Sequence, residues 1–248
     1  MCKAEITKLA EILNNSKNIV FFGGAGVSTE SGIPDFRGAH GVWNEKLRIE
    51  LSPEQLVSHT AYCRYPEVFF EFYRDKLLYP QAEPNACHIA LAKLEAMGKL
   101  KAVVTQNIDG LHQRAGSRTV YELHGSVHRN YCEECHAFYD INFILNTEGV
   151  PCCTKCGGRV KPDVVLFEEG LDNDIIRDSI EAISQADTLI IAGTSLVVQP
   201  AASLIDYFSG RSLILINMTA TAADRRADLV LRAPVGEVMQ EVMQQLVD

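Results

Sequence analysis

Two cysteine pairs carry the Cys-x-x-Cys spacing that suits a metal ion. Cys132 pairs with Cys135 and Cys153 with Cys156, and seventeen residues separate the two pairs. Each pair supplies two thiolates from one tight turn, and four thiolates satisfy tetrahedral Zn²⁺. Two redox pairs or unrelated buried cysteines are the alternatives, but the spacing favours a zinc ribbon. Because four protein ligands leave no open position, the sequence predicts one structural zinc ion.

The other cysteines have no such pairing. Cys152 adjoins Cys153 and is a competing ligand, although its use would lengthen the spacing of the second pair. Cys2, Cys63 and Cys87 are predicted to be ordinary small apolar residues. The N-terminal residues show no apolar run of signal-peptide length, so we expect reduced thiols and a cytoplasmic location.

A glycine-rich segment, 24–38, follows the apolar run 19–22, which predicts a turn after a buried strand. Glycines at such a turn let backbone N–H groups approach a diphosphate, so nucleotide binding is expected. Thr29 stands where the dinucleotide fingerprint has its third glycine, and Pro34 ends any helix after about two turns. Hydride transfer is therefore disfavoured. The loop 35–37 offers an acid, an aromatic ring and a cation beyond the diphosphate.

Polar residues follow a second apolar run, 102–104, in the segment Thr105–Asp109. Ligands of doubly wound sheets bind at the carboxyl ends of strands, and amide and acid side chains there suit a polar ring amide and a water molecule. The alternative is a loop in which Asn and Asp serve turns. Gly193, Thr194 and Ser195 follow another apolar run, and Asn217 a further one, where they suit ribose hydroxyls and adenine.

His124 lies just before the cysteine-rich segment and is a candidate general base near neutral pH. A single histidine is more often a surface or packing residue, and the other six are equally eligible by composition. His112 follows Asp109 closely, while His88 falls in a helical pattern and is expected to be structural.

An alternating series of strands and helices must position these residues. Strands are expected at 19–22, 102–104, 164–167, 188–192, 213–216 and 229–231. Helical patterns cover 6–13, 85–97, 174–185, 201–208 and 236–246. This order predicts an α/β fold, a Rossmann-like doubly wound parallel sheet with helices on both faces. The large domain comprises 1–43, 85–129 and 162–248, with a helical insert at 44–84 and a zinc-ribbon module inserted at 130–161.

Composition limits the class of partner. The chain has 248 residues and a formal net charge of −9, which argues against nucleic acid because phosphate contacts need clustered cations. No segment is as long and apolar as a membrane span, so no membrane partner is expected. An acidic protein suits a basic protein or peptide substrate, and we expect a monomer.

Taken together, these motifs resemble the sirtuins, the NAD-dependent protein deacylases, of bacterial type. The match runs in order through the Gly24 loop, 34–37, 105–109, His124 with Gly125, both cysteine pairs, 193–195 and Asn217. It covers almost the whole chain. The resemblance implies that NAD and acyl-lysine meet in a cleft between the Rossmann-like domain and the zinc module. NAD is consumed, and deacetylation yields free lysine, nicotinamide and O-acetyl-ADP-ribose.

The resemblance also implies roles for individual residues. The acyl oxygen attacks C1′ of the nicotinamide ribose, and His124 then activates a ribose hydroxyl, with Asn107 as the second catalytic residue. NAD contacts are implied for Gly24, Ala25, Gly26, Thr29, Asp35, Phe36, Arg37, Gln106, Asn107, Ile108, Asp109, His124, Gly193, Thr194, Ser195, Asn217 and Val235. Phe36 would shield the reacting centre from water. The acyl-lysine protein or peptide would meet Val165, Phe167, Glu168, Tyr73 and Lys76.

Two departures from the family pattern bear on the substrate. Where sirtuins carry Phe-Gly-Glu for strand addition by the peptide, this chain has Phe167-Glu168-Glu169, which predicts a shift toward basic residues in the peptide. Desuccinylating members carry Tyr-x-x-Arg in the acyl pocket, whereas Tyr73 is followed here by Lys76. Lysine lacks the bidentate contact of arginine, so deacetylation is favoured over removal of acidic acyl groups.

Four other functions are alternatives to deacetylation. Removal of other acyl groups or ADP-ribosyl transfer would use the same NAD pocket, the latter with less need of His124. A non-catalytic nucleotide-binding module would explain the sheet and the glycine-rich loop, but not the zinc ribbon. A dehydrogenase is disfavoured by Thr29 and Pro34.

Overall fold

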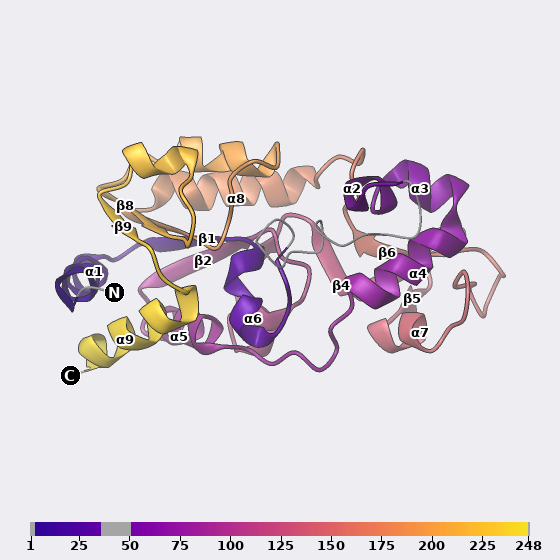
Figure 1. Ribbon diagram of the computed structural model, residues 1–248, viewed down its shortest axis with the longest axis horizontal. Coiled ribbons are helices and arrows are strands. Elements are labelled where there is room, and N and C mark those ends of the chain that lie inside the picture. Colours follow the sequence, from indigo (N-terminus) through magenta and orange to yellow (C-terminus); the bar gives the residue numbers. More distant parts are fainter. Residues whose placement is uncertain (1–2, 36–50, 248) are drawn as a thin grey trace.

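A six-stranded parallel sheet forms the centre of the molecule. The computed structural model describes residues 3–35 and 51–247. The strand order is β3-β2-β1-β7-β8-β9, so the chain builds outward from β1 in one direction and from β7 in the other (Figure 1). The strands are β1 Ile19–Gly23, β2 Leu100–Thr105, β3 Val120–Glu122, β7 Thr188–Ala192, β8 Ser212–Ile216 and β9 Leu229–Leu231. The predicted doubly wound α/β fold is confirmed.

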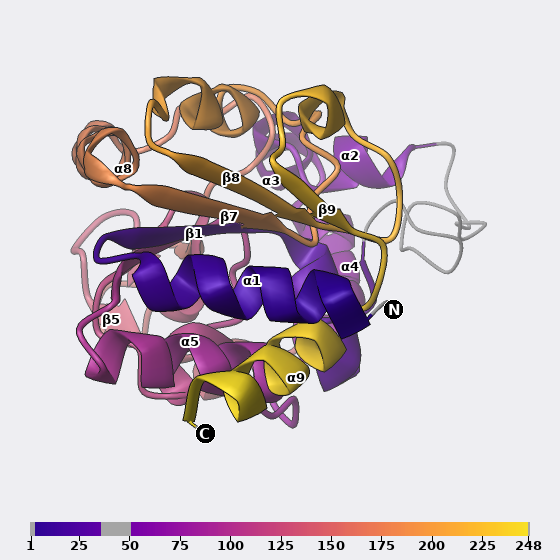
Figure 2. The same ribbon diagram turned by 90° about the vertical axis from the view of Figure 1, so that its left-hand side faces the viewer.

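Helices cover both faces of this sheet (Figure 2). Every residue of β1 is buried, because its side chains enter an apolar cluster on each face, Phe21 on one and Phe22 on the other. Such burial on both faces explains why the central strands read as continuous apolar runs. On the Phe21 face lie α1 Lys3–Asn15, α5 Ala86–Ala96 and α9 Val235–Val247; on the Phe22 face lie α8 Asn173–Gln185 and the 3-10 helices Ala201–Tyr207 and Ala222–Arg225.

Local signals set where these helices begin. The Asn85 side chain accepts a hydrogen bond from Cys87 N, and His88 Nδ1 accepts one from Asn85 N, so the two residues cap α5 reciprocally. Asp172 caps α8 by accepting from the amides of residues 174 and 175. None of the described helices has the length and apolar character needed to cross a membrane.

A second, antiparallel sheet of order β5-β4-β6 lies beside the first, with β4 Gly125–Cys132, β5 Phe138–Tyr139 and β6 Val160–Val164. Four short helices pack around it: α2 Pro53–Leu56, α3 His59–Arg64, α4 Pro66–Lys76 and α7 Ile141–Leu145. A third apolar cluster joins the aromatic side chains of α3 and α4 to β4 and β6. Arg129 also bonds Glu122 and Asp163, both at 2.7 Å, which ties the small sheet to the edge of the large one.

The elements differ from the predicted ones in five places. The run 164–167 is not a strand of the parallel sheet, because Val164 ends β6 and the following residues turn toward α3. Strand β3 was not predicted, and it is short and half-buried at the sheet edge. The segment 201–207 is a 3-10 helix, and the glycine-rich segment holds two single-turn 3-10 helices, Ala25–Val27 and Thr29–Ser31. A short α6, Leu111–Arg114, follows β2.

Candidate active site and zinc centre

Four parallel strands deliver polar residues to one edge of the sheet. β1 and β7 are neighbours from which the chain departs in opposite directions, so their carboxyl ends mark the switch point where ligands of such sheets bind. β1 ends at the glycine-rich loop, β2 at Thr105, β7 at Gly193 and β8 at Asn217. The fold therefore brings together the strand-end segments that the sequence singles out.

The glycines of two of these loops pack directly against each other. A Cβ on Gly26 would lie 2.7 Å from Gly193 Cα, and one on Gly193 would lie 2.4 Å from Val27 N. Gly24 N donates to Ala192 O at 3.2 Å and Gly26 N donates to Gly193 O at 2.8 Å. These two N–H groups are therefore not free to bind a diphosphate, and contact of the two glycines with NAD stays a prediction. Both glycines instead allow close approach of the loops, and their amides are already bonded within the protein.

Two buried polar side chains and one half-buried carboxylate form a connected network beyond the first loop. Asn107 Nδ2 donates to Ser28 Oγ at 3.0 Å, and Ser28 Oγ donates to Asp109 Oδ2 at 2.7 Å. Asp109 also accepts from Leu111 N at the start of α6. Ser28 is 1% exposed and Asn107 8%. Ser28 was not predicted as a site residue, because a serine within a glycine-rich run gives no signal of contact with a loop about eighty positions away.

The neighbours of this network link β2 to β7 and to the small sheet. Gln106 Nε2 donates to Thr194 Oγ1 at 3.0 Å, and Gln106 N donates to Gly23 O. Val127 N donates to Ile108 O, and the Ile108 side chain packs against the apolar cluster of the small sheet. Residues 106–109 therefore lie between the two sheets.

His124 lies between β3 and β4, next to the network. Its Nδ1 is 2.9 Å from Gln106 O. Since a carbonyl oxygen only accepts, Nδ1 carries the hydrogen and Nε2 is left as the proton acceptor. Burial lowers the pKa of His124 below its usual value, although the bond to Gln106 opposes this shift. A neutral imidazole held in one tautomer is the form that a general base needs.

Gly125, which follows His124, cannot carry a side chain. Its φ is +73°, and a Cβ would lie 1.9 Å from Asp163 O on the paired strand β6. We expect Gly125→Ala to destabilise the protein by at least about 2 kcal/mol, measured by denaturant unfolding. Gly98→Ala is the matched control, because Gly98 has the same φ with nothing within 4 Å, and should cost about 1 kcal/mol. Equal losses in the two variants would show that the clash with β6 is absent.

The remaining predicted NAD contacts differ in their exposure and bonding. Thr29 Oγ1 donates to Gly26 O, and Asn217 Nδ2 donates to Thr219 O. Ser195 is exposed, whereas Val235 is 3% exposed and belongs to the apolar cluster under the sheet, which leaves it little surface for a ligand. Ala25 and Asp35 are half-buried. Phe36 and Arg37 lie outside the described residues.

The predicted peptide segment runs beside His124 and α3. Val165 N donates to His124 O, while Phe167 N and O pair with Val57 O and His59 N. Glu168 has a φ of +76°, and its carboxylate accepts a hydrogen bond from Thr60 N at 2.8 Å. This bond and opposite charges nearby lower the pKa of Glu168. The carboxylate thus compensates for backbone strain that a glycine would avoid.

The two residues predicted for the acyl pocket, Tyr73 and Lys76, have different surroundings. Tyr73 is fully buried in the apolar cluster that joins α4 to the small sheet, and burial strongly raises its pKa. Lys76 ends α4, is partly exposed and pairs with Asp75 at 3.2 Å.

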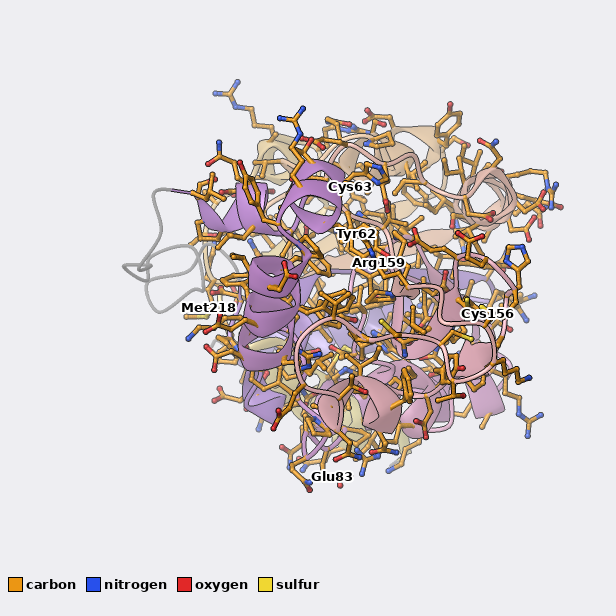
Figure 3. The ribbon with its side chains drawn as sticks, turned by 90° about the vertical axis from the view of Figure 1, so that its right-hand side faces the viewer. Tyr62, Cys63, Glu83, Cys156, Arg159 and Met218 are labelled. Carbon is orange, nitrogen blue, oxygen red and sulfur yellow. The ribbon has the colours of Figure 1, made fainter. Side chains whose placement is uncertain are left out.

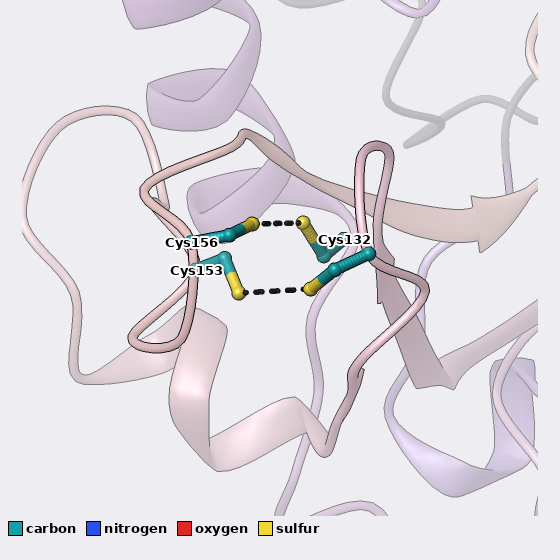
Figure 4. A group of neighbouring side chains, drawn as sticks. Cys132, Cys153 and Cys156 are labelled. Atoms are coloured by element: carbon teal, nitrogen blue, oxygen red, sulfur yellow. Dashed lines mark hydrogen bonds between the residues drawn. The ribbon is translucent and has the colours of Figure 1, made fainter.

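The four predicted zinc ligands converge at the outer end of the small sheet (Figure 4). Their sulfur atoms all lie within 4.8 Å of one another, with Cys132 Sγ to Cys156 Sγ at 3.4 Å and Cys135 Sγ to Cys153 Sγ at 3.5 Å. Four sulfurs bound tetrahedrally at about 2.3 Å from zinc lie about 3.8 Å apart, so the cluster fits this ion. The cysteines are positioned to bind one zinc ion.

Tyr139 supports this centre, and Cys152 stands outside it. The Tyr139 hydroxyl donates to Cys153 Sγ at 3.1 Å, which favours the thiolate form that binds metal. Cys152 is exposed, and its Sγ lies 3.5 Å from Val150 O. Cys153 is therefore the sulfur directed into the cluster.

A family model described as Sir2 family matches residues 24–200. An NAD-dependent protein deacetylase of Clostridium perfringens is 67% identical over 240 residues, covering 96% of this chain and 98% of that protein. A protein of the same description from Clostridium acetobutylicum is 58% identical, with the same coverage of both chains.

Solved structures resemble the whole fold. One, on the mechanism and regulation of Sir2 enzymes, has a TM-score of 0.89, 43% identity and coverage of 99% of both chains. Another, Sir2 with p53 peptide and NAD⁺, has a TM-score of 0.85, 39% identity and coverage of 97% of this chain and 98% of its own. A third holds Sir2 with deacetylated p53 peptide and 3′-O-acetyl ADP-ribose, with a TM-score of 0.89, 38% identity and the same two coverages.

Proposed function

The chain belongs to the Sir2 family, and on this premise we propose how its residues share the work of deacetylation. It is an NAD-dependent protein deacetylase that uses NAD and contains one structural zinc site. The observation that carries the proposed site is the network of Ser28, Asn107 and Asp109 beside His124, at the switch point of the sheet.

We propose that NAD lies across the carboxyl ends of β1, β2, β7 and β8. The polar side chains there fit its chemistry, because amide and hydroxyl donors together with a carboxylate acceptor match ribose hydroxyls and the nicotinamide amide. NAD supplies the ribose carbon that takes up the acyl oxygen as nicotinamide departs. Asn107 and Asp109 hold the nicotinamide ribose end, and Thr194, Ser195 and Asn217 hold the adenosine end.

In this proposal His124 acts as the base. Its Nδ1–H is committed to Gln106 O at 2.9 Å, so only Nε2 can take a proton from a ribose hydroxyl. Leu123 N donates to Thr105 O and Val165 N donates to His124 O, so backbone bonds on both sides fix the imidazole. The protein therefore orients the base before any substrate arrives.

Ser28 is proposed as the residue that orients both Asn107 and Asp109. We expect Ser28→Ala to lower kcat/KM for NAD roughly tenfold to hundredfold, because buried Asn107 and half-buried Asp109 lose their shared partner. Ser31→Ala is the control, since the Ser31 hydroxyl contacts Asn85 instead, and its activity should stay within about twofold. Steady-state assays with varied NAD measure both. Equal kinetics for the two variants would remove Ser28 from the site.

The acyl-lysine peptide is proposed to add as a strand along Val165–Glu168. Glu169 is neutralised internally, because it contacts Lys161 Nζ at 3.1 Å, His59 Nδ1 at 2.9 Å and Leu166 N at 2.9 Å. Glu168 is thus the acid left to favour basic residues in the peptide. Swapping a flanking lysine of the peptide for glutamate should raise KM.

Acetyl is the proposed acyl group in preference to succinyl. The Tyr73 hydroxyl is buried in an apolar cluster, and Lys76 already pairs with Asp75. Neither side chain offers the bidentate cationic contact that a second carboxylate would require.

We further propose the large domain at 1–43, 85–129 and 162–248, the helical insert at 44–84 and the zinc module at 130–161. A cytoplasmic location is supported by the four thiols, which need a reducing compartment to remain zinc ligands. The net charge of −9 supports the absence of a nucleic-acid partner. The monomeric state is a prediction that light scattering tests.

Mass spectrometry of an acetyl-lysine peptide, with and without NAD, tests the function. Acetyl loss that requires NAD, matched by nicotinamide and O-acetyl-ADP-ribose, is the expected result. Nicotinamide release from an unchanged peptide would instead favour another acyl group or ADP-ribosyl transfer.

A further inference from the structure

Cys63 was predicted to be an ordinary apolar residue, but it is exposed on α3 and contacts a base. Its Sγ lies 3.3 Å from Nε2 of His59, four residues earlier on the same helix. Side chains four residues apart face each other along a helix, so this contact follows from the spacing. The described part of the chain thus carries a thiol–imidazole pair outside the NAD site.

Glu169 orients this imidazole from the other side. Its Oε1 is 2.9 Å from His59 Nδ1, and its Oε2 is held by Lys161 Nζ and Leu166 N. Since a carboxylate accepts the Nδ1 hydrogen, Nε2 faces the thiol as a proton acceptor. A nucleophile, a base and an orienting carboxylate in this order form the arrangement that activates cysteines.

The helix that carries the pair is fixed in place. The Tyr62 hydroxyl donates to Glu133 Oε2 at 2.8 Å, and the Arg159 guanidinium lies 4.9 Å from the centre of the Tyr62 ring. Figure 3 shows Cys63 beside Tyr62 and Arg159, and well separated from the zinc ligand Cys156. The thiol is therefore accessible and held toward its base, and it is not one of the four clustered sulfurs.

From this geometry we infer that Cys63 is a thiol-modification site that takes small-molecule disulfides. His59 Nε2 accepts the thiol proton, and the resulting thiolate attacks one sulfur of the disulfide R–S–S–R. The Cys63–S–S–R bond forms as the R–S–S–R bond breaks. The leaving thiolate takes the proton from His59 and departs as RSH, so Cys63 is oxidised while one R–S group is reduced. A reducing thiol reverses the exchange.

The adduct would form next to the proposed peptide segment. His59 N donates to Phe167 O, and Thr60 N donates to the Glu168 carboxylate. These two hydrogen bonds join the start of α3 to the peptide segment. This position links the thiol to the substrate side of the molecule, whereas the NAD network lies on other elements.

The test measures adduct formation by bis(2-hydroxyethyl) disulfide on the zinc-loaded full chain at pH 7, followed by peptide mass spectrometry. Cys152 is the internal control, because it is exposed but lies beside a carbonyl oxygen in place of a base. We expect Cys63 to react at least roughly tenfold faster than Cys152. Adduct formation does not depend on deacetylation, so this test is independent of the test of the proposed function.

Two variants test the assignment of the base. In His59→Gln the Cys63 rate should fall to within about twofold of the Cys152 rate, and Glu169→Gln should give an intermediate rate. Thermal unfolding and zinc content identify a variant that has failed to fold, in which case the other variant decides. Equal rates for Cys63 and Cys152 in the unaltered protein, or a Cys63 rate untouched by both folded variants, would overturn the inference.

Discussion

Replacing His124 by alanine should lower kcat for an acetyl-lysine peptide by about 10²–10⁴-fold, the range that a positioned general base contributes. His124 Nδ1 is committed to Gln106 O, so Nε2 is the atom poised to take a proton. Alanine removes that acceptor, while the residues proposed to hold NAD keep their own partners. The measurement is a steady-state assay of O-acetyl-ADP-ribose and free lysine.

Nicotinamide exchange provides the control for this variant. In the proposed mechanism the base acts after nicotinamide has left, so exchange of labelled nicotinamide into NAD should persist in the presence of acetyl peptide. If exchange and deacetylation fell together, His124 would be needed for NAD binding or for the first step. Unchanged deacetylation would exclude His124 as the base.

The pH dependence gives a second measurement of the same role. Burial lowers the pKa of His124 from 6.5, and a base acts in its deprotonated form. The value of kcat/KM should therefore fall as the pH drops through the pKa of His124, which lies below 6.5. Between that pKa and pH 7, kcat/KM should not change with pH. An acid limb above 6.5 would contradict the environment that the structure gives this imidazole.

Much of the site could be predicted from sequence because it follows strand ends. A continuous apolar run marks a strand buried on both faces, and polar residues directly after it must lie at its carboxyl end. Residues 105–109, 193–195 and 217 were placed in this way, and the structure has them at one sheet edge. The cysteine spacing likewise predicted a four-sulfur cluster, because each pair needs only a local turn.

Elements without a continuous apolar run escaped prediction. Strand β3 is a half-buried edge strand of three residues, too short to show any periodicity. Strand β6 contains Pro162, which is tolerated because β6 pairs on one side only, with β4. Buried and half-buried positions alternate along β6. The apolar run 164–167, which was predicted as a strand, begins where β6 ends.

Contacts between distant segments could not be predicted. Spacing alone does not distinguish a glycine that allows a ligand to approach from one that allows another loop to approach. Gly26 is of the second kind, because it packs against Gly193. The proposed orienting role of Ser28 depends on its contacts with Asn107 and Asp109, which follow a different strand. Cys63 was judged by the average burial of cysteine, whereas its surroundings depend on how α3 lies against Glu169.

Loss of one buried zinc ligand should abolish both zinc binding and activity. We expect Cys153→Ser to reduce zinc from one ion per chain to near zero and to lower kcat/KM at least about a hundredfold. Structural zinc contributes about 10–16 kcal/mol of apparent binding free energy in isolated zinc-finger peptides, so its loss removes much of what folds the module. Elemental analysis, thermal unfolding and the deacetylation assay measure the three effects.

Cys152→Ser is the matched control for this substitution. The two cysteines are adjacent, but Cys152 is exposed and outside the cluster, while Cys153 is 4% exposed within it. Zinc content, melting temperature and activity should all remain unchanged in Cys152→Ser. If Cys152→Ser lost zinc and Cys153→Ser kept it, the second pair would have been assigned to the wrong sulfur.

Strand β4 connects the cysteine cluster to His124, the proposed base. Cys132 ends this strand and Gly125 begins it, directly after His124, so the strand joins the metal cluster to the proposed base. Its partner β6 leads into Val165, whose amide donates to His124 O. Unfolding of the module without zinc therefore releases the anchor through Val165, while the bond from Leu123 N to Thr105 O belongs to the large sheet. Full activity in a protein shown to be zinc-free would mean that the apolar cluster shared with α3 and α4 holds β4 unaided.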